Sequence, residues 1–334
     1  ALMPVAAFAA SAQNSDTPAL QRWHESIAAG YETLATEAAE FQSAARAYCS
    51  APDSDTRAKI NQAWLDAFLA WQGVRFVDFG PVEQDNLAWQ FQFWPDPKNL
   101  IAKKARFLLG SDQAVTPAVI RESGVAVQGF PMAEYLLFDQ PFNAGDRALP
   151  VEKTCELLGT LAGHIATNSD TLHQQWRAFG PHYLGSDQYR EATIRSAMTA
   201  LEILEERRLA LPMGLKGNGK RSVYGADAWR SGTSLNSIRA TVAGLQAHFL
   251  PGLSLLLKQN DQARLAERIE QQFGEVLENF PELDTPMAPL LTDDARFAAL
   301  QGFYVDVSQL VTMINDQAAI ELGIVRGFNS SDGD

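Results

Sequence analysis

Several features that mark common functional classes are scarce in this sequence. Only two of its 334 residues are cysteine, too few and too isolated for a zinc or iron–sulfur centre. The net charge is −13 and no Lys/Arg cluster occurs, so the chain lacks the positive field that nucleic-acid phosphates require. After the first residues, no apolar run reaches the ~18 residues that span a membrane. These absences argue against nucleic-acid binding and against a transmembrane segment.

The common catalytic signatures are missing as well. His24-Glu25 is followed by Ser26-Ile27-Ala28, so this pair does not begin an HExxH zinc-protease helix, and neither a GxSxG elbow nor a P-loop occurs. The histidines never lie three or four positions apart, as ligands on one helical face would; they are His24, His164, His173, His182 and His248. Surface or capping roles are favoured for all five.

The first residues, ALMPVAAFAASAQNSD, are small and apolar and then turn polar. Ala10-Ser11-Ala12 fits a small-x-small signal-peptidase site, with Gln13 as the first mature residue. Residues 1–12 are therefore interpreted as the tail of an export leader, and a disordered Ala-rich terminus is the alternative. The chain is therefore predicted to be exported and soluble.

The two cysteines, Cys49 and Cys155, lie in different parts of the chain. Because disulfides persist in exported proteins, we predict that the two are bonded to each other; two buried free thiols are the alternative. A closed loop of this length contributes about 4–5 kcal/mol of stability in the chain-entropy model.

Apolar residues recur at steps of three and four along most of the chain, which predicts an all-α protein. One long helix is marked by Leu20, Trp23, Ile27, Tyr31, Leu34, Ala38, Phe41, Ala45 and Tyr48. Asp53 is expected to cap the next helix, and Pro251 to kink or break the one that begins near Ser234. No alternating segment predicts a strand.

Irregular stretches at 78–99, 139–150 and 214–225 interrupt the helical pattern. The second is the best candidate for a domain boundary, which gives an N-terminal helical bundle over 13–145 and a C-terminal one over 146–334. Each half holds about four principal helices, so two helical bundles packed side by side are predicted.

Two groups of polar residues suggest a ligand site. Trp71, Arg75 and Asp78 share one helical face if the second helix continues that far, and they would then line a cleft; a local ion pair at the helix end is the alternative. The segment AWRSGTS, 228–234, contains Trp229, Arg230 and Ser231 before a predicted helix. Free backbone N–H groups beside Arg230 suit an anionic group, although simple capping by Thr233 or Ser234 explains the same residues.

The segment GFPMAEYLLF, 129–138, predicts a short apolar helix with proline near its start. Glu134 lies one turn into it, where a carboxylate either supports the helix terminus or forms part of a ligand site. Because the helix is apolar nearly all round, we expect it to be buried and Glu134 to have a polar or charged partner.

Five segments in this order resemble the imelysin-like family of bacterial envelope proteins, which are labelled as peptidases and associated with iron uptake. They are WLDAFLAWQGVRFVDFGP, FWPDPKN, GFPMAEYLLF, AWRSGTSLNSIRA and the tail GFNSSDGD. The resemblance runs from about Leu20 to the C-terminus and implies two helical-bundle domains with a functional cleft at their interface. It also implies a location in the bacterial periplasm or cell envelope. At the cleft it places Arg75 and Arg230 as the charged candidates to meet Glu134.

The family hallmark GxHxxE is only partly matched. Gly129 and Glu134 occupy its ends, but Pro131 stands where the histidine belongs. The resemblance implies iron or another metal ion as the ligand, and a proline cannot ligate it. Glu134 is thus the only candidate metal ligand that the motif supplies.

These observations lead to three hypotheses. The first is an exported binding protein that holds a small ligand or metal ion between two bundles, serves iron or nutrient uptake and works with another envelope or transport protein. Its polar lining would be Glu134, Arg75, Asp78, Arg230 and Ser231, and its apolar wall Trp71 and Trp229. The second is a metallopeptidase, and the third an envelope interaction protein.

Overall fold

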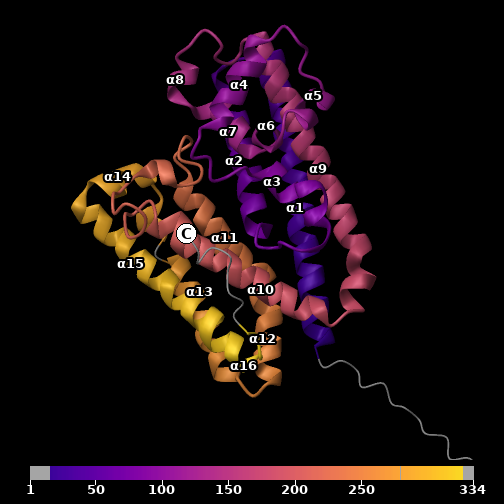
Figure 1. The fold of residues 1–334 in the computed structure, drawn as a ribbon, viewed down its shortest axis with the longest axis vertical. Coiled ribbons are helices and arrows are strands. Elements are labelled where there is room, and N and C mark those ends of the chain that lie inside the picture. Colours follow the sequence, from indigo (N-terminus) through magenta and orange to yellow (C-terminus); the bar gives the residue numbers. More distant parts are fainter. Residues whose placement is uncertain (1–15, 279, 326–334) are drawn as a thin grey trace, which may run out of the picture.

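The computed structural model describes residues 16–278 and 280–325. The predicted leader, residues 1–12, and the family-like tail GFNSSDGD lie outside this range. The described residues form helices and connecting loops with no strand, which confirms the all-α prediction. Figure 1 shows two helical bodies lying side by side.

The first body contains three long helices, α1, α2 and α9, and several short ones that cover one end of them (Figure 1). Its elements are α1 Thr17–Ser50, α2 Ser54–Val74, η1 Gly80–Asn86, α3 Leu87–Phe91, α4 Leu100–Gly110, α5 Pro117–Glu122, α6 Val125–Gln128, α7 Phe130–Phe138, α8 Gln140–Asn143 and α9 Glu152–Leu184. The apolar stripe predicted for the first helix is buried along α1. Asp53 caps α2, as predicted, by accepting a hydrogen bond from the Thr56 amide.

The second body follows α9. Its elements are α10 Gln188–Ile203, the π-helical η2 Leu204–Ala210, η3 Val223–Gly225, α11 Ser234–His248, α12 Leu250–Gln259, α13 Ala263–Glu278, η4 Phe280–Leu283, α14 Met287–Thr292, α15 Asp294–Val311, the π-helical η5 Thr312–Ala318 and α16 Ala319–Glu321. The predicted break at Pro251 is present, since α11 and α12 meet there at 44°. The indole N–H of Trp23 on α1 donates to the Phe249 carbonyl at this bend over 2.7 Å.

The two bodies meet along α2 and α11. Gly73 and Gly244 face each other there, and a Cβ on Gly244 would overlap the Gly73 backbone. The absence of side chains lets the helices touch backbone to backbone. This contact fixes how α2 of the first body lies against the second.

The segment after the predicted domain boundary returns to the first body. α9 packs most extensively along α1, and Cys155 in its first turn is joined to Cys49 at the end of α1, with 5.8 Å between the two Cα atoms. The division of the chain into independent domains at residue 145 stays a prediction.

One described helical stretch, Asp294–Glu321, is long and apolar enough to cross a membrane by length and composition. α11 and α12 meet the same criterion only as a bent pair. Buried core helices of globular proteins also meet it, and α15 packs against α13, α14 and η2. The stretch therefore does not by itself assign the chain to a membrane.

Candidate functional site

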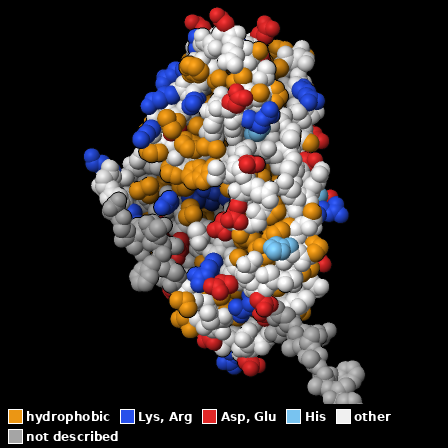
Figure 2. Space-filling view, turned by 45° about the vertical axis from the view of Figure 1, so that its right-hand side comes forward, with side chains coloured by type: hydrophobic (Ala, Val, Ile, Leu, Met, Phe, Trp, Pro, Cys, Tyr) orange, Lys and Arg blue, Asp and Glu red, His pale blue; other side chains and the backbone are white. Residues whose placement is uncertain are grey.

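A cavity of about 940 Å³ lies where the short helices of the first body face the loop before α11. Its aromatic lining residues include Phe93, Trp94, Tyr135, Phe142, Tyr224 and Trp229. Its charged ones are Asp96, Arg106, Glu134, Asp139, Asp146, Arg147, Arg207, Asp227 and Arg230. Figure 2 shows a hollow at mid-height bordered by hydrophobic side chains, with basic and acidic ones beside it, a composition that matches this lining.

The helix α7 places Glu134 at the cavity. Gly129 precedes it, and a Cβ there would overlap the backbone carbonyl groups of Gln90 and Phe91 at the end of α3. The indole N–H of Trp64 on α2 donates to the Phe130 carbonyl over 3.1 Å. Contacts with α2 and α3 thus fix the start of α7, and Glu134 follows one turn later.

Glu134 is buried, with 4% of its surface exposed, and it does not cap its own helix. One oxygen accepts hydrogen bonds from both the backbone N–H and the hydroxyl of Ser231, each over 2.8 Å. Burial raises the pKa of Glu134 to about 7, against the lowering effect of Ser231 and the positive charge of Arg230. The protein's own carboxylate therefore occupies the anion position that the sequence predicts beside Arg230.

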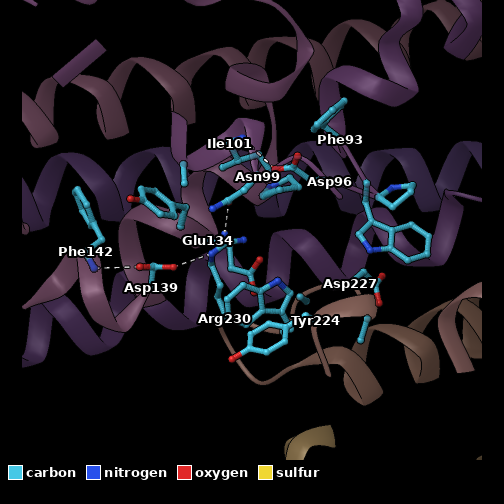
Figure 3. A pocket seen from close by; sticks show the side chains of 18 of the residues that line it. Phe93, Asp96, Asn99, Ile101, Glu134, Asp139, Phe142, Tyr224, Asp227 and Arg230 are labelled. Carbon is cyan, nitrogen blue, oxygen red and sulfur yellow. Dashed lines mark hydrogen bonds and ion pairs between the residues drawn. The ribbon is translucent and has the colours of Figure 1, made fainter. Parts of the chain in front are cut away.

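Arg230 lies beside Glu134 and connects the two bodies (Figure 3). Its Nε donates to Asp139 over 2.9 Å and its Nη2 to the Asn99 side chain over 3.1 Å. The guanidinium also lies 4.4 Å from the ring centre of Trp229 and 5.3 Å from that of Tyr135. Asp139 and Asn99 belong to the first body, and Arg230 belongs to the loop before α11. The hydrogen bonds of Arg230 therefore connect the two walls of the cavity.

Asp227 forms the centre of a buried polar network behind the cavity. It pairs with Arg208 of η2 over 3.1 Å, and the two side chains are 1% and 2% exposed. Arg75 lies 3.6 Å from the same carboxylate oxygen. Burial, with the nearby positive charge of Arg208, lowers the pKa of Arg75 to about 10. One carboxylate thus interacts with two guanidinium groups, and the cluster of three side chains keeps a net positive charge.

Two glutamines extend this network into the first body. Arg208 also donates to Gln72 of α2 over 3.1 Å, and Gln72 donates to Gln92 over 2.7 Å. Gln92 accepts a further hydrogen bond from the indole of Trp71 over 3.1 Å. The network therefore couples the end of α2 to η2 and to the loop that carries Asp227.

The structure brings most of the predicted site residues together. Glu134, Trp229 and Arg230 line the cavity, and Ser231 holds Glu134. Arg75 reaches the site through Asp227 and lies 5.6 Å from the ring centre of Trp94, another lining residue. Trp71 is buried behind the cavity rather than forming its wall. Their role in binding stays a prediction.

The expectation that Asp78 joins this cleft is wrong. α2 ends at Val74 with Arg75 as its C-cap, so the helical spacing that placed Arg75 and Asp78 on one face does not extend to Asp78. Asp78 is exposed in the following turn and does not line the cavity. The partner of Arg75 is Asp227.

Sequence reasoning missed Asp227, Arg208 and Asp139. Asp227 directly precedes the AWRSGTS segment, so its position next to a predicted site was the available signal. Arg208 lies in a helical run rich in charged residues, and nothing local distinguishes it from its exposed neighbours. Asp139 follows α7 and also caps α8 by accepting from the Phe142 amide, so it reads as a turn residue.

The cavity does not fit a metal ion bound by protein ligands alone. Among residues 16–278 and 280–325, no group of three or more His, Cys, Asp or Glu side chains is arranged to hold one. Glu134 is accompanied by Ser231 and Arg230, and a guanidinium disfavours a cation at the same place. Pro131 supplies no donor.

Comparisons with known proteins identify relatives of the whole helical assembly. The family model described as Imelysin, Peptidase M75, matches residues 27–314. An imelysin-like protein from Psychrobacter arcticum is similar in structure with a TM-score of 0.81 and 21% identity, over 94% of this chain and 97% of that one. A protein assigned as an iron-regulated protein A precursor from Parabacteroides distasonis has a TM-score of 0.70 and 14% identity, over 94% and 98%. A search of curated proteins returns no significant match.

Proposed function

The chain belongs to the imelysin family, and from this premise we propose that it is an exported, non-hydrolytic binding protein whose ligand occupies the cavity beside Glu134 and Arg230. Its role would be the uptake of iron or of another nutrient at the bacterial envelope. A second envelope or transport protein would then receive the ligand.

The cavity itself carries this proposal. Ligand sites of proteins are concave, largely apolar and between ~300 and ~1,000 Å³, with a few convergent polar groups. The cavity of about 940 Å³ has this size, and the buried Glu134 and the half-buried Arg230 project from facing walls beside aromatic side chains (Figure 3). A carboxyl and a guanidinium that connect two helical bodies are suited to binding a ligand between them.

Export is supported by the sequence of residues 1–12 and by the word precursor in the name of the Parabacteroides distasonis protein. The name of that protein also calls it iron-regulated, which supports the link to iron. N-terminal sequencing of the protein recovered from the periplasmic fraction is expected to begin at Gln13. Recovery of the intact first residues from the cytoplasmic fraction alone would overturn the export proposal.

The metallopeptidase alternative receives no support from the site. Peptide hydrolysis by zinc requires about three protein ligands and an activated water. The described residues provide no such set, and Pro131 removes the histidine of the family motif.

Iron accumulation in cells tests the proposed role. In the bacterium that carries this gene, deletion is expected to lower radioactive iron uptake under iron limitation, and the wild-type chain to restore it. Gly225→Trp fills part of the cavity, because Gly225 lines it and a Cβ there meets its neighbours only at ordinary contact distances. This variant is expected not to restore uptake.

The matched control is Gly302→Trp, at an exposed position of α15 where a Cβ meets nothing within 4 Å. It is expected to restore uptake like the wild type. Unchanged iron uptake in the deletion strain would contradict the iron role. Full restoration by Gly225→Trp would contradict the cavity as the site.

A further inference from the structure

Resting on the proposed function, we propose that the cavity takes an organic anion with a flat, unsaturated body, and that a metal, if carried, enters as the complex of such an anion and not as a bare cation. Three features of the cavity point to such a ligand: the charges that already have partners, the aromatic walls and the position of Glu134.

The carboxylates of the inner cavity are already engaged. Asp96 accepts from the first amides of α4, Leu100 and Ile101, over 2.7 and 3.0 Å. Asp139 pairs with Arg230, and Asp227 with Arg208. These groups have little capacity left for a cation, since each oxygen accepts from a donor that would otherwise be buried without a partner.

Three arginines of the lining, unlike these carboxylates, have no charged partner among the described residues. Arg106 on α4, Arg147 in the loop before α9 and Arg207 on η2 are exposed. Within the part of the chain that the structure describes, none of them forms an ion pair; Arg147 donates only to the Arg106 carbonyl over 3.4 Å. A guanidinium binds a carboxylate through two parallel hydrogen bonds. Here the first body supplies two such groups, Arg106 and Arg147, and the second body supplies Arg207.

The negative net charge of the protein makes these three exposed arginines a stronger indication of an anion site. The whole chain carries −13, so a general attraction for anions is excluded. Only Asp146 among the exposed lining residues adds a negative charge close to these arginines. The cavity mouth is thus a local positive region on an acidic protein.

The lining that holds these arginines and Glu134 also contains aromatic side chains from both bodies. Tyr224 is 73% exposed and meets Trp229 edge to face, with 4.9 Å between ring centres. Phe142 and Tyr135 form a second aromatic pair, 5.0 Å apart, on the wall of the first body. Flat unsaturated ligands gain stacking and dispersion contacts between such walls, whereas small inorganic ions do not.

Glu134 is the third feature that favours an anionic ligand in the cavity. Its side chain borders the cavity. Three residues of one loop face it: Ser231, which donates to one oxygen, Arg230 and Asp227. Arg75 is linked to Glu134 through its pair with Asp227. A protonated carboxyl can donate a hydrogen bond to a ligand oxygen, whereas an ionised one repels an anion. Burial raises the pKa of Glu134, which favours the protonated form.

Equilibrium dialysis with 2,3-dihydroxybenzoate tests the class of ligand, because this probe is flat and carries a carboxylate. The metal-free probe, its ferric complex and Zn²⁺ alone are compared on the full chain. We expect saturable binding of the first two at one site. The double variant Arg106→Gln/Arg207→Gln is expected to weaken it about tenfold, and added salt to weaken it in the wild type.

The matched control is Arg264→Gln/Arg268→Gln, which removes two positive charges at exposed positions of α13, outside the cavity. It is expected to bind the probe like the wild type. If the ferric complex binds and the metal-free probe does not, the ligand is carried only as a metal complex, which still agrees with the proposal.

The direction of the pH dependence separates an anion from a cation. The carboxylate of the metal-free probe stays ionised between about pH 6 and about pH 8, so ionisation of Glu134 should weaken its binding as the pH rises, and Glu134→Gln should remove most of that slope. A bare cation would bind more tightly as the pH rises. Tight binding of Zn²⁺ lost in Glu134→Gln, or no saturable binding of either form of the probe, would overturn the inference. In that case, iron uptake that falls in the deletion strain and is restored by the wild-type chain would still leave the proposed function standing.

Discussion

Ser231 directs both its backbone N–H and its hydroxyl at the same oxygen of Glu134, each over 2.8 Å. The two residues lie 97 positions apart and belong to the two facing walls of the cavity. The arrangement stabilises the ionised carboxylate, yet burial outweighs it and the pKa of Glu134 rises to about 7. The cavity therefore contains an acid that changes charge near neutral pH.

This carboxyl predicts a pH dependence of stability. The pKa of Glu134 is about 7 in the folded protein and 4.5 without burial, so between these values the folded state holds a proton that the unfolded state has released. The resulting cost is absent below about pH 4.5 and fully present above about pH 7, at most on the order of 3 kcal/mol. Glu134→Gln cannot ionise and should lose this component.

Urea denaturation at several pH values measures the effect. The difference in unfolding free energy between wild type and Glu134→Gln is expected to change in favour of the variant as the pH rises from about 4.5 to about 7.5. Glu32→Gln on the exposed side of α1 is the control and should follow the wild type. A constant difference across this range would contradict the buried, proton-holding state of Glu134.

The ion pair between Asp227 and Arg208 predicts a large effect on stability. Asp227→Ala would leave the fully buried Arg208, and Arg75 beside it, without a carboxylate. Breaking a buried pair by removing one partner costs about 3–5 kcal/mol. The measurement is chemical denaturation, with Glu191→Ala as the control, because its pair with Arg195 on α10 is exposed and should contribute less than ~1 kcal/mol. Equal losses in the two variants would contradict this assignment.

The sequence predicts the helices better than the site. Periodicity alone locates α1 and its buried stripe, because a long amphipathic helix repeats the same signal over many turns. It failed at Asp78, since one helix end after Val74 removes the face on which the prediction depended. The pair of Asp227 with Arg208 could not be predicted, because it depends on how η2 packs against the loop before α11 and not on local spacing.

Glu134 shows the intermediate case. Its burial follows from the apolar helix around it, and Arg230 was a candidate neighbour on sequence grounds. Its actual hydrogen-bond donor, Ser231, was predicted as part of the polar lining of the site but not as the partner of Glu134. The burial of Glu134 could be predicted from its own segment. Its hydrogen-bond donor could not, because the packing of the two bodies decides which segments meet.

The link between Cys49 and Cys155 predicts a contribution to stability of about 4–5 kcal/mol, because it closes a loop with a sequence separation of 106. The double variant Cys49→Ala/Cys155→Ala should lose it, and added reductant should then have no further effect on denaturation. Mass spectrometry of unreduced protein is the direct check. Alkylation of two free thiols in the native sample would refute the bond.

The site predicts that the purified protein does not cleave peptides. Activation of water by a bound metal needs about three protein ligands and an open position, and the cavity residues in the described ranges supply no such set. A peptide library incubated with the protein and Zn²⁺ should remain intact in mass spectra. Chelator-sensitive cleavage that disappears in Glu134→Gln would require a return to the metallopeptidase hypothesis.

The last prediction concerns Gly129, the first residue of the partly matched GxHxxE motif. Its φ of −128° is open to any residue, so the requirement for glycine is purely steric. A Cβ would overlap the carbonyl oxygens of Gln90 and Phe91 and lie 2.6 Å from the Phe91 carbonyl carbon, all backbone atoms that cannot rotate away. Gly129→Ala should therefore push α7 from α3 and cost about 1–3 kcal/mol, as overpacked cores do.

The internal control is Gly159→Ala in the middle of α9, where a Cβ meets nothing within 4 Å. Alanine is the better helix former, so this variant should be more stable than the wild type by about 0.5–1 kcal/mol. Thermal denaturation of the two variants should therefore shift in opposite directions. If Gly129→Ala is as stable as the wild type, the glycine is not required for packing, and its presence in the motif needs a ligand-based reason. If it is destabilised as expected, the glycine is retained for the contact between α7 and α3, independently of the histidine that Pro131 replaces.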